Sequence, residues 1–80
     1  MKPLWDDAPE WARWLAVNKR GNWYWFEFKP HADMMFNVFT PSRKRRSSRY
    51  QFAGKNLPTY QENEGWMHTR ERRNDGIRKV

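Results

Sequence analysis

The strongest hydrophobic pattern in the chain is an aromatic run from Asn22 to Phe28. It reads Asn-Trp-Tyr-Trp-Phe-Glu-Phe, and aromatic side chains favour the half-buried surface of a strand. Gly21 and Pro30 flank the run, as expected for residues that end a strand. Because successive side chains of a strand point to opposite faces, both faces carry large rings. The run therefore predicts a central strand over 22–29 that is covered on both sides.

The segment before this strand, residues 8–18, fits either a helix or a strand. A helix is supported by an acidic capping pattern, a proline in the first turn and tryptophans along one helical face. A strand is supported by the Asn-Lys-Arg-Gly sequence at 18–21, which is typical of a type I turn closed by a left-handed glycine. We favour a strand over 11–18 and keep the helix as the alternative. Both structures bury Trp11 and Leu15.

Two further strands are predicted in the middle of the chain. A turn at 30–33 leads into a third strand over 34–40, and a polar loop at 41–48 leads into a fourth over 48–53. These two strands would form a second hairpin, with the polar loop as its tip. The residues expected to point inward are Met34, Phe36, Val38, Tyr50 and Phe52.

The two ends of the chain carry weaker signals. Residues 1–10 contain two prolines and predict an irregular lead-in, from which Trp5 docks on the rings of the central strand. Residues 66–74 fit a short helix or a final strand, which Trp66 would anchor. Residues 75–80 are expected to fray.

These elements predict one small domain over residues 1–80 of mainly β class, or α+β if the helical alternatives hold. Its sheet has three to four antiparallel strands. The sequence contains six Trp, five Phe and three Tyr but no cysteine, so no disulfide or thiolate metal site can brace it. Each ring can bury about 150–250 Å². We therefore expect an aromatic core.

The charge of the chain is strongly basic and unevenly distributed. Sixteen Lys and Arg against nine Asp and Glu give a net charge of +7. The densest cluster contains no acid and consists of Arg43, Lys44, Arg45, Arg46 and Arg49. Such a cluster favours nucleic acid, whose phosphates release counterions when they bind cations. Tyr50, Phe39 and Tyr60 are candidates to stack on unpaired bases. We expect contact through a cationic hairpin loop, with solubility as the competing explanation of the charge.

No pattern in the sequence supports catalysis, metal binding or membrane insertion. His31 and His68 lie far apart, and neither has an identifiable partner for general-base chemistry. Phosphate-binding glycine loops, nucleophile elbows and the His-Glu-x-x-His motif are all missing from the sequence. No apolar run approaches the roughly 20 residues of a membrane span, and no signal-peptide pattern is present. We expect a cytoplasmic protein that is not an enzyme and has no cofactor.

A wider pattern joins several of these segments. It consists of Ala-Pro-Glu-Trp-Ala at 8–12, Gly-Asn-Trp-Tyr-Trp-Phe-Glu at 21–27, Lys-Pro at 29–30 and the later Trp66. This pattern resembles small uncharacterised proteins of tailed bacteriophages, which often carry acids in the turn where this chain has Asn-Lys-Arg. The resemblance implies a phage origin, the cytoplasm of a host cell and the favoured hairpin. It transfers no active site. Small phage proteins often bind nucleic acid or host proteins, which is an argument by analogy.

A protein-interaction module is the alternative function. The aromatic content exceeds what a small core needs, and Trp, Tyr and Arg are the preferred anchors of interfaces. Trp5, Trp11 and Trp14 are the candidate anchors. The partner would be a host protein, in a host-takeover or anti-defence role implied by the phage resemblance. A homodimer is also consistent with the sequence, because an open sheet edge invites pairing.

Overall fold

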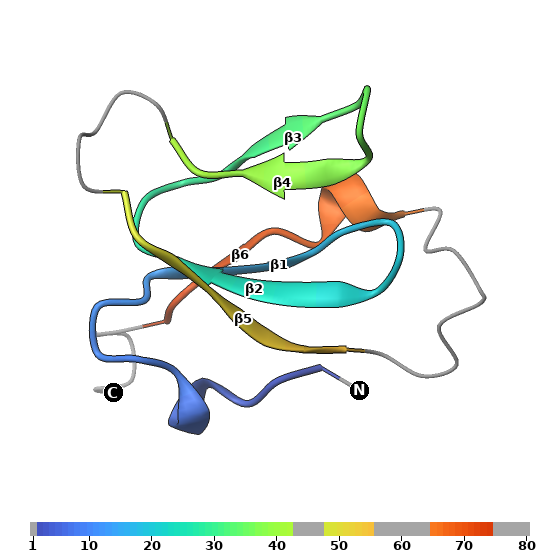
Figure 1. The fold of residues 1–80 in the computed structure, drawn as a ribbon. Helices are drawn as coiled ribbons and strands as arrows, with labels where there is room; N and C mark the ends of the chain where they lie inside the picture. Colours follow the sequence, from blue (N-terminus) through green and yellow to red (C-terminus); the bar gives the residue numbers. More distant parts are fainter. Residues whose placement is uncertain (1, 43–47, 56–64, 75–80) are drawn as a thin grey trace.

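The fold is organised around one hairpin, β1–β2, which lies inside a larger sheet. The computed structural model describes residues 2–42, 48–55 and 65–74. Its elements are η1 (Trp5–Asp7), β1 (Trp14–Val17), β2 (Asn22–Phe26), β3 (His31–Asp33), β4 (Val38–Thr40), β5 (Tyr50–Lys55), η2 (Trp66–His68) and β6 (Glu71–Arg72). A four-stranded antiparallel sheet has the order β5-β2-β1-β6, and β3 pairs with β4 in a separate two-stranded sheet (Figure 1). The predicted mainly β class is confirmed.

The turn between β1 and β2 has the chemistry that its sequence predicts. Gly21 N–H donates to the Asn18 carbonyl and Asn18 N–H donates to the Asn22 carbonyl, both at 3.0 Å. Gly21 has a φ of +91°, which suits glycine because a side chain is strained in the left-handed region. This is a type I turn followed by a left-handed residue, a common hairpin loop. The hairpin is therefore confirmed, and the helix over 8–18 is wrong.

Alternation along β1 and β2 builds a core cluster on each face of the four-stranded sheet. The first cluster contains Ala12, Leu15, Val17, Trp23 and Trp25. The second contains Ala16, Phe26, Phe39 and Trp66. We call the face with the first cluster the closed face and the face with the second the open face. The predicted central strand with large rings on both sides is confirmed.

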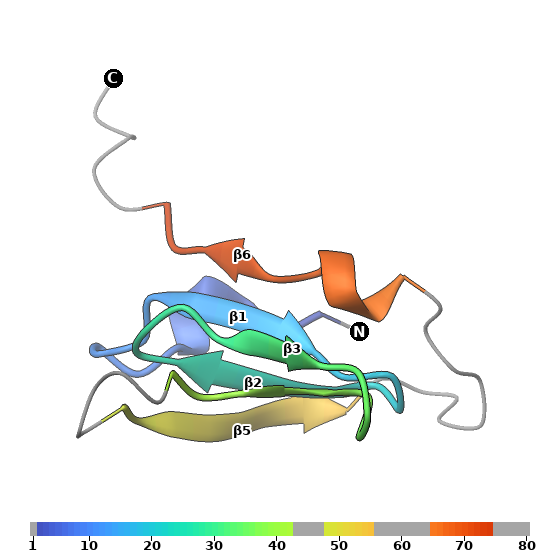
Figure 2. The ribbon, with the colours of Figure 1, turned by 90° about the horizontal axis from the view of Figure 1, so that it is seen from above.

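Different segments cover these two faces. The N-terminal segment, including η1, packs on the closed face, where the Trp5 and Trp25 ring centroids lie 4.9 Å apart. The predicted docking of Trp5 is thus confirmed. The β3–β4 hairpin lies over the open face (Figures 1 and 2), where Phe39 meets Trp66 edge-on at 5.3 Å. The protein consequently has three layers: the N-terminal segment, the four-stranded sheet in the middle and the β3–β4 hairpin.

The prediction for residues 30–40 is corrected by the structure. Instead of a turn at 30–33 and a strand over 34–40, two short strands, β3 and β4, flank a turn over 34–37. They pair with each other in antiparallel register. The predicted third strand is therefore wrong over its first half.

Local turn chemistry explains why the apolar alternation fails there. Asp33 Oδ1 accepts hydrogen bonds from Met35 N–H at 3.0 Å and from Phe36 N–H at 3.3 Å. Asn37 has a left-handed φ of +58°. Asp and Asn favour turns through such bonds and through their tolerance of positive φ. As a result Met34 and Phe36, predicted to point inward, are 58% and 69% exposed.

The predicted second hairpin is also wrong. β5 pairs with β2, whereas β4 pairs with β3, so the segment between Ser42 and Ser48 connects two sheets. Tyr50 and Phe52, predicted to point inward, are 59% and 53% exposed. The reason is that β5 is an edge strand of the four-stranded sheet, and the hairpin over the open face leaves these two rings uncovered.

The C-terminal part combines both of its predicted alternatives. A single turn of 3-10 helix, η2, buries Trp66 and is followed by β6, which pairs with β1. The lead-in over the first ten residues contains the short η1 and otherwise no regular element among its described residues. The tail expected to fray, 75–80, lies outside the described residues.

Candidate binding surface on the open face

Three rings form a continuous surface on the open face, across β2 and β5. Tyr24 is half-buried, and its ring meets Phe52 edge-on at 5.6 Å and Tyr50 at 6.4 Å. Tyr50 stacks on the buried Phe26 with centroids 6.4 Å apart and an interplanar angle of 26°. We call Tyr24, Tyr50 and Phe52 the aromatic strip. Its members are held by cross-strand contacts while the outer sides of Tyr50 and Phe52 remain in solvent.

The sequence of β5 places these rings on the same side. Tyr50 and Phe52 are two residues apart, so they share one face of the strand. They lie directly opposite Phe26 and Tyr24 in the register of the sheet. Ala53 packs on the closed face instead, and the register shifts near it, between Trp23 and Tyr24. β5 therefore contributes to both faces of the sheet. Ala53 packs against the cluster on the closed face, and the rings of Tyr50 and Phe52 lie on the open face.

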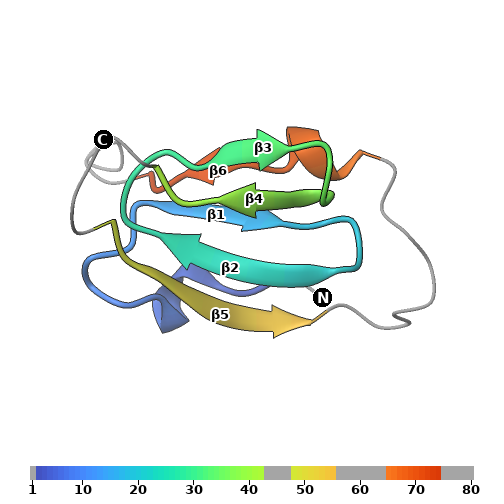
Figure 3. The ribbon, with the colours of Figure 1, turned by 45° about the horizontal axis from the view of Figure 1, so that its top comes forward.

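A cavity of about 240 Å³ adjoins the aromatic strip. Its walls come from β1, β2, β4 and β5 and from the residues that follow β1 and β4. The lining residues are Ala16, Asn18, Tyr24, Phe26, Val38, Phe39, Pro41 and Tyr50. The cavity therefore lies between the four-stranded sheet and the β3–β4 hairpin, whose arrangement Figure 3 shows. Among the described residues that line the cavity, Asn18 is the only polar one besides the two tyrosines.

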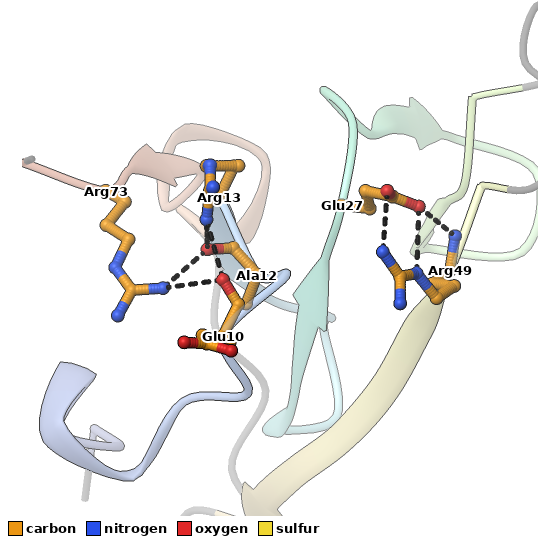
Figure 4. A network of polar contacts seen from close by, with 6 residues as sticks. All are labelled: Glu10, Ala12, Arg13, Glu27, Arg49 and Arg73. Atoms are coloured by element: carbon orange, nitrogen blue, oxygen red, sulfur yellow. Dashed lines mark hydrogen bonds and ion pairs between the residues drawn. The ribbon is translucent and has the colours of Figure 1, made fainter.

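Arg49, a predicted nucleic-acid contact, is held by Glu27 (Figure 4). Its Nη2 lies 2.9 Å from Glu27 Oε2, and both its Nε and its backbone N–H donate to Oε1 at 3.2 Å. The side-chain hydrogen bond lowers the pKa of Glu27 and raises the pKa of Arg49. The Arg49 guanidinium also lies over the Trp11 ring, 5.0 Å from its centroid. Arg49 thus fixes the start of β5 beside the end of β2.

The remaining predicted cations, Arg43, Lys44, Arg45 and Arg46, lie outside the described residues. Pro41 lines the cavity together with Tyr50, two residues beyond Ser48. Within the described part of the chain, Ser48 Oγ is the buried side-chain polar atom that has no hydrogen-bond partner. The sequence therefore connects four cations to both sides of the cavity rim.

The three predicted interface tryptophans are half-buried, and each has a cation over its ring. Arg73 lies 5.5 Å from the Trp5 centroid, Arg49 covers Trp11, and Lys29 and Arg70 each lie 6.0 Å from the Trp14 centroid. Trp5 Nε1 also donates to Glu71 Oε2 at 2.8 Å. Much of the surface of these three rings is therefore occupied by packing and cation–π contacts within the molecule.

Three further arginines, Arg13, Arg70 and Arg73, donate hydrogen bonds to backbone carbonyls within the fold. Arg73 donates to the Ala12 carbonyl at 2.9 Å, and Arg13 donates to the Glu10 carbonyl at 2.8 Å (Figure 4). Arg70 donates to the Pro30 carbonyl at 2.9 Å. These guanidinium groups satisfy backbone carbonyls that strand pairing leaves open, and two of them fix the N-terminal segment on the closed face.

Sequence reasoning identified Tyr50 but missed Phe52 and the cavity. The two-residue spacing of Tyr50 and Phe52 indicates that they share a face, but both were predicted to point inward and are more than half exposed. Nothing in the sequence indicates the cavity, because its walls come from four strands that are distant along the chain.

Other site types find no support among the described residues. No group of three or more histidine or acidic side chains in that part of the chain is arranged to hold a metal ion. No helix there is long and apolar enough to cross a membrane. Comparisons of the chain with protein-family models, with curated proteins and with solved structures find no match.

Proposed function

We propose that this protein is a small basic binding module that holds single-stranded nucleic acid on its open face. The observation that carries the proposal is the aromatic strip, in which two rings on one edge strand are more than half exposed. Large exposed rings next to one another are uncommon on a soluble domain unless they bind something. Base–aromatic stacking contributes about 1–3 kcal/mol per base and tolerates any base.

The charge of the chain favours the same ligand. The net charge is +7, and four of the cations lie in sequence between Ser42 and Ser48. Because Arg49 is already paired with Glu27, we assign the phosphate contacts to Arg43, Lys44, Arg45 and Arg46. In this proposal the cations hold the backbone and the aromatic strip holds the bases.

Unpaired bases suit this surface better than a duplex. A ring on a sheet can stack on a base only if that base is not already stacked between its neighbours, as it is in double-stranded DNA or RNA. We therefore propose a preference for single strands, of which either DNA or RNA supplies the necessary rings and phosphates.

Fluorescence anisotropy with labelled oligonucleotides tests the proposal. Single strands should bind more tightly than duplexes of the same length. Four phosphate contacts predict a roughly 50-fold loss of affinity between about 50 and 200 mM salt. Each of the variants Tyr50→Ala and Phe52→Ala should weaken binding by about 5- to 150-fold.

Gln51→Ala is the matched control, because Gln51 is exposed on β5 between the two rings and points to the other side. Its affinity should equal that of the wild type. Arg45→Glu combined with Arg46→Glu should abolish binding. Binding that is insensitive to salt and to both ring substitutions would refute the proposal.

A protein-interaction module is the second candidate, and a different observation favours it. Met34, Met35 and Phe36 form an exposed apolar tip on the β3–β4 hairpin, and methionine suits surfaces that adapt to a partner. Under a tailed-bacteriophage origin, which we also propose, the partner would be a host protein. A photo-crosslinker at position 35 in a nuclease-treated lysate tests this candidate. A crosslinked partner that persists with Phe36→Ser in place would count against it.

A further inference from the structure

Asn18 is a buried polar residue, and only the oxygen of its side-chain amide forms hydrogen bonds with described residues. Its side chain is 8% exposed, and its Oδ1 accepts hydrogen bonds from Arg20 N–H and Asn22 N–H, both at 3.0 Å. Because both partners are donors, the atom that faces them must be the oxygen. The amide nitrogen therefore points away from the turn.

The nitrogen of this amide is available to a ligand in the cavity. In the described part of the chain, the hydrogen bonds of the Asn18 side chain all use Oδ1. Ser48 Oγ is the buried side-chain atom without a partner there, so the unpaired Asn18 nitrogen is not sealed from solvent. Asn18 is one of the residues that line the cavity, so the N–H donors of its amide can serve a ligand that binds there. A fixed donor without a partner, in a cavity whose other described polar lining residues are Tyr24 and Tyr50, favours a ligand with an acceptor oxygen.

We infer that this cavity receives one thymine or uracil base of the bound strand, which Asn18 recognises through its amide nitrogen. The inference rests on the proposed function and adds a base preference to it. The volume of about 240 Å³ lies below the roughly 300–1,000 Å³ of sites for drug-sized ligands. That size suits a one-ring pyrimidine better than a two-ring purine. Phe26 and Phe39 supply the apolar walls.

The geometry of a pyrimidine explains which of its groups meets Asn18. The sugar is attached at N1 and stays with the backbone outside the cavity, so the opposite edge enters first. At that edge thymine and uracil carry the acceptor O4, whereas cytosine carries an amino donor. The donor of Asn18 can bond O4. Facing cytosine, it would leave two donors unpaired, which is costly in a buried site.

Tyr50 connects the cavity to the aromatic strip. It lines the cavity and also belongs to the strip, where Tyr24 contacts it at 6.4 Å. A strand could therefore stack bases on the exposed side of β5 and insert one base past Tyr50. In this arrangement the cavity recognises one base specifically, whereas the aromatic strip stacks on any base.

Competition between oligothymidylate and oligocytidylate of about 12 nucleotides, a length typical of single-strand sites, tests the inference. The wild type should bind oligothymidylate about 5- to 150-fold more tightly, the range expected for an unpaired buried donor. Asn18→Asp keeps an oxygen for Arg20 and Asn22 but replaces the free donor with an acceptor. Its preference should move toward oligocytidylate.

Gln51→Glu is the matched control for the added negative charge. It should weaken both oligonucleotides equally and leave their affinity ratio at the wild-type value. Thermal unfolding verifies that Asn18→Asp is folded. If it is not, Val38→Phe fills the cavity from β4 and should bring the ratio close to one while binding persists.

The outcomes separate this inference from the proposed function. Binding that needs Tyr50 and Phe52 but shows equal affinity for the two oligonucleotides would overturn the base-reading cavity alone. A ratio that is the same in Asn18→Asp and Gln51→Glu would overturn it as well. If no oligonucleotide binds at low salt, both the proposed function and the cavity assignment fail.

Discussion

The two faces of the central sheet use aromatic residues in opposite ways. On the closed face, Trp23 and Trp25 are buried under the N-terminal segment, and Trp5 packs against Trp25 at 4.9 Å. On the open face, Tyr50 and Phe52 remain more than half exposed. β2 carries large rings on both faces, and β5 adds Tyr50 and Phe52 to the open face. What differs is the segment that covers them.

The two covers are attached differently. The N-terminal segment is attached by Arg73, which donates to the Ala12 carbonyl, and by the Lys2–Glu71 ion pair at 2.6 Å. The β3–β4 hairpin buries Phe39 against Trp66 and forms one wall of the cavity, but it leaves Tyr50 and Phe52 more than half exposed. Both faces thus contribute a buried cluster to the core, but only the open face leaves large rings in solvent, and these rings carry the binding that we propose.

The largest expected effect is a difference in stability between substitutions on the closed face and on the open face. Trp25→Ala should lower the free energy of unfolding by about 3–5 kcal/mol, the usual cost of deleting a buried large ring. This is a large share of the roughly 4–12 kcal/mol expected for 80 residues. Phe52→Ala should cost at most about 1 kcal/mol, the scale of a cross-strand pair. Urea unfolding of both variants measures the difference, and equal losses would contradict the comparison.

The next effect concerns the hairpin that both faces share. Gly21→Ala should destabilise the protein by about 1–2 kcal/mol, because its φ of +91° is unfavourable for a residue with a side chain. Gly65→Ala is the control, since its φ is −95° and nothing lies within 4 Å of an added Cβ. That variant should gain about 0.4–1 kcal/mol. Loss of stability in both variants would refute this explanation of the turn.

A smaller effect probes the cover of the closed face. Trp5→Phe keeps a ring against Trp25 but removes the hydrogen bond from Nε1 to Glu71, so thermal unfolding should show a loss of about 1 kcal/mol. Its affinity for oligonucleotides should be unchanged, because Trp5 belongs to the other face. Weaker binding by Trp5→Phe would show that the two faces are not independent.

The smallest effect is a pH dependence from the Glu27–Arg49 pair. The hydrogen bond from Arg49 lowers the pKa of Glu27 in the folded protein, so the pair stabilises the fold fully above the unfolded pKa of about 4.3. That contribution is lost as the pH falls through the lower, folded pKa. Wild type and Glu27→Gln should differ slightly in melting temperature at neutral pH and converge in acid. A difference that grows in acid would contradict this sign.

Much of the central sheet could be predicted from the sequence because its signals are local and agree with one another. The alternation at Trp23, Tyr24, Trp25 and Phe26 and the Asn-Lys-Arg-Gly turn both specify the β1–β2 hairpin. The docking of Trp5 followed from the need of a large ring in a loop to be buried. These features depend on residues that are close in sequence or on the period of one strand.

The remaining errors arise where local turn chemistry overrides an apolar pattern or where distant residues decide the structure. The pattern at Met34–Phe36 resembles a strand, but Asp33 and Asn37 convert it into an exposed turn. The partner of β5 is β2, which no local signal indicates, so the exposure of Phe52 was missed. Asn18 was identified as a turn residue, but its second role depends on a cavity that exists only after four strands meet.

The most direct test of the division between the two faces is an NMR titration of nitrogen-15-labelled protein with oligothymidylate. The backbone amides of Tyr50 and Phe52 and the side-chain amide of Asn18 should shift. The indole N–H signals of Trp5 and Trp25, on the closed face, should stay in place. Shifts confined to those indoles, or no shift at low salt, would contradict the assignment of the open face as the binding surface.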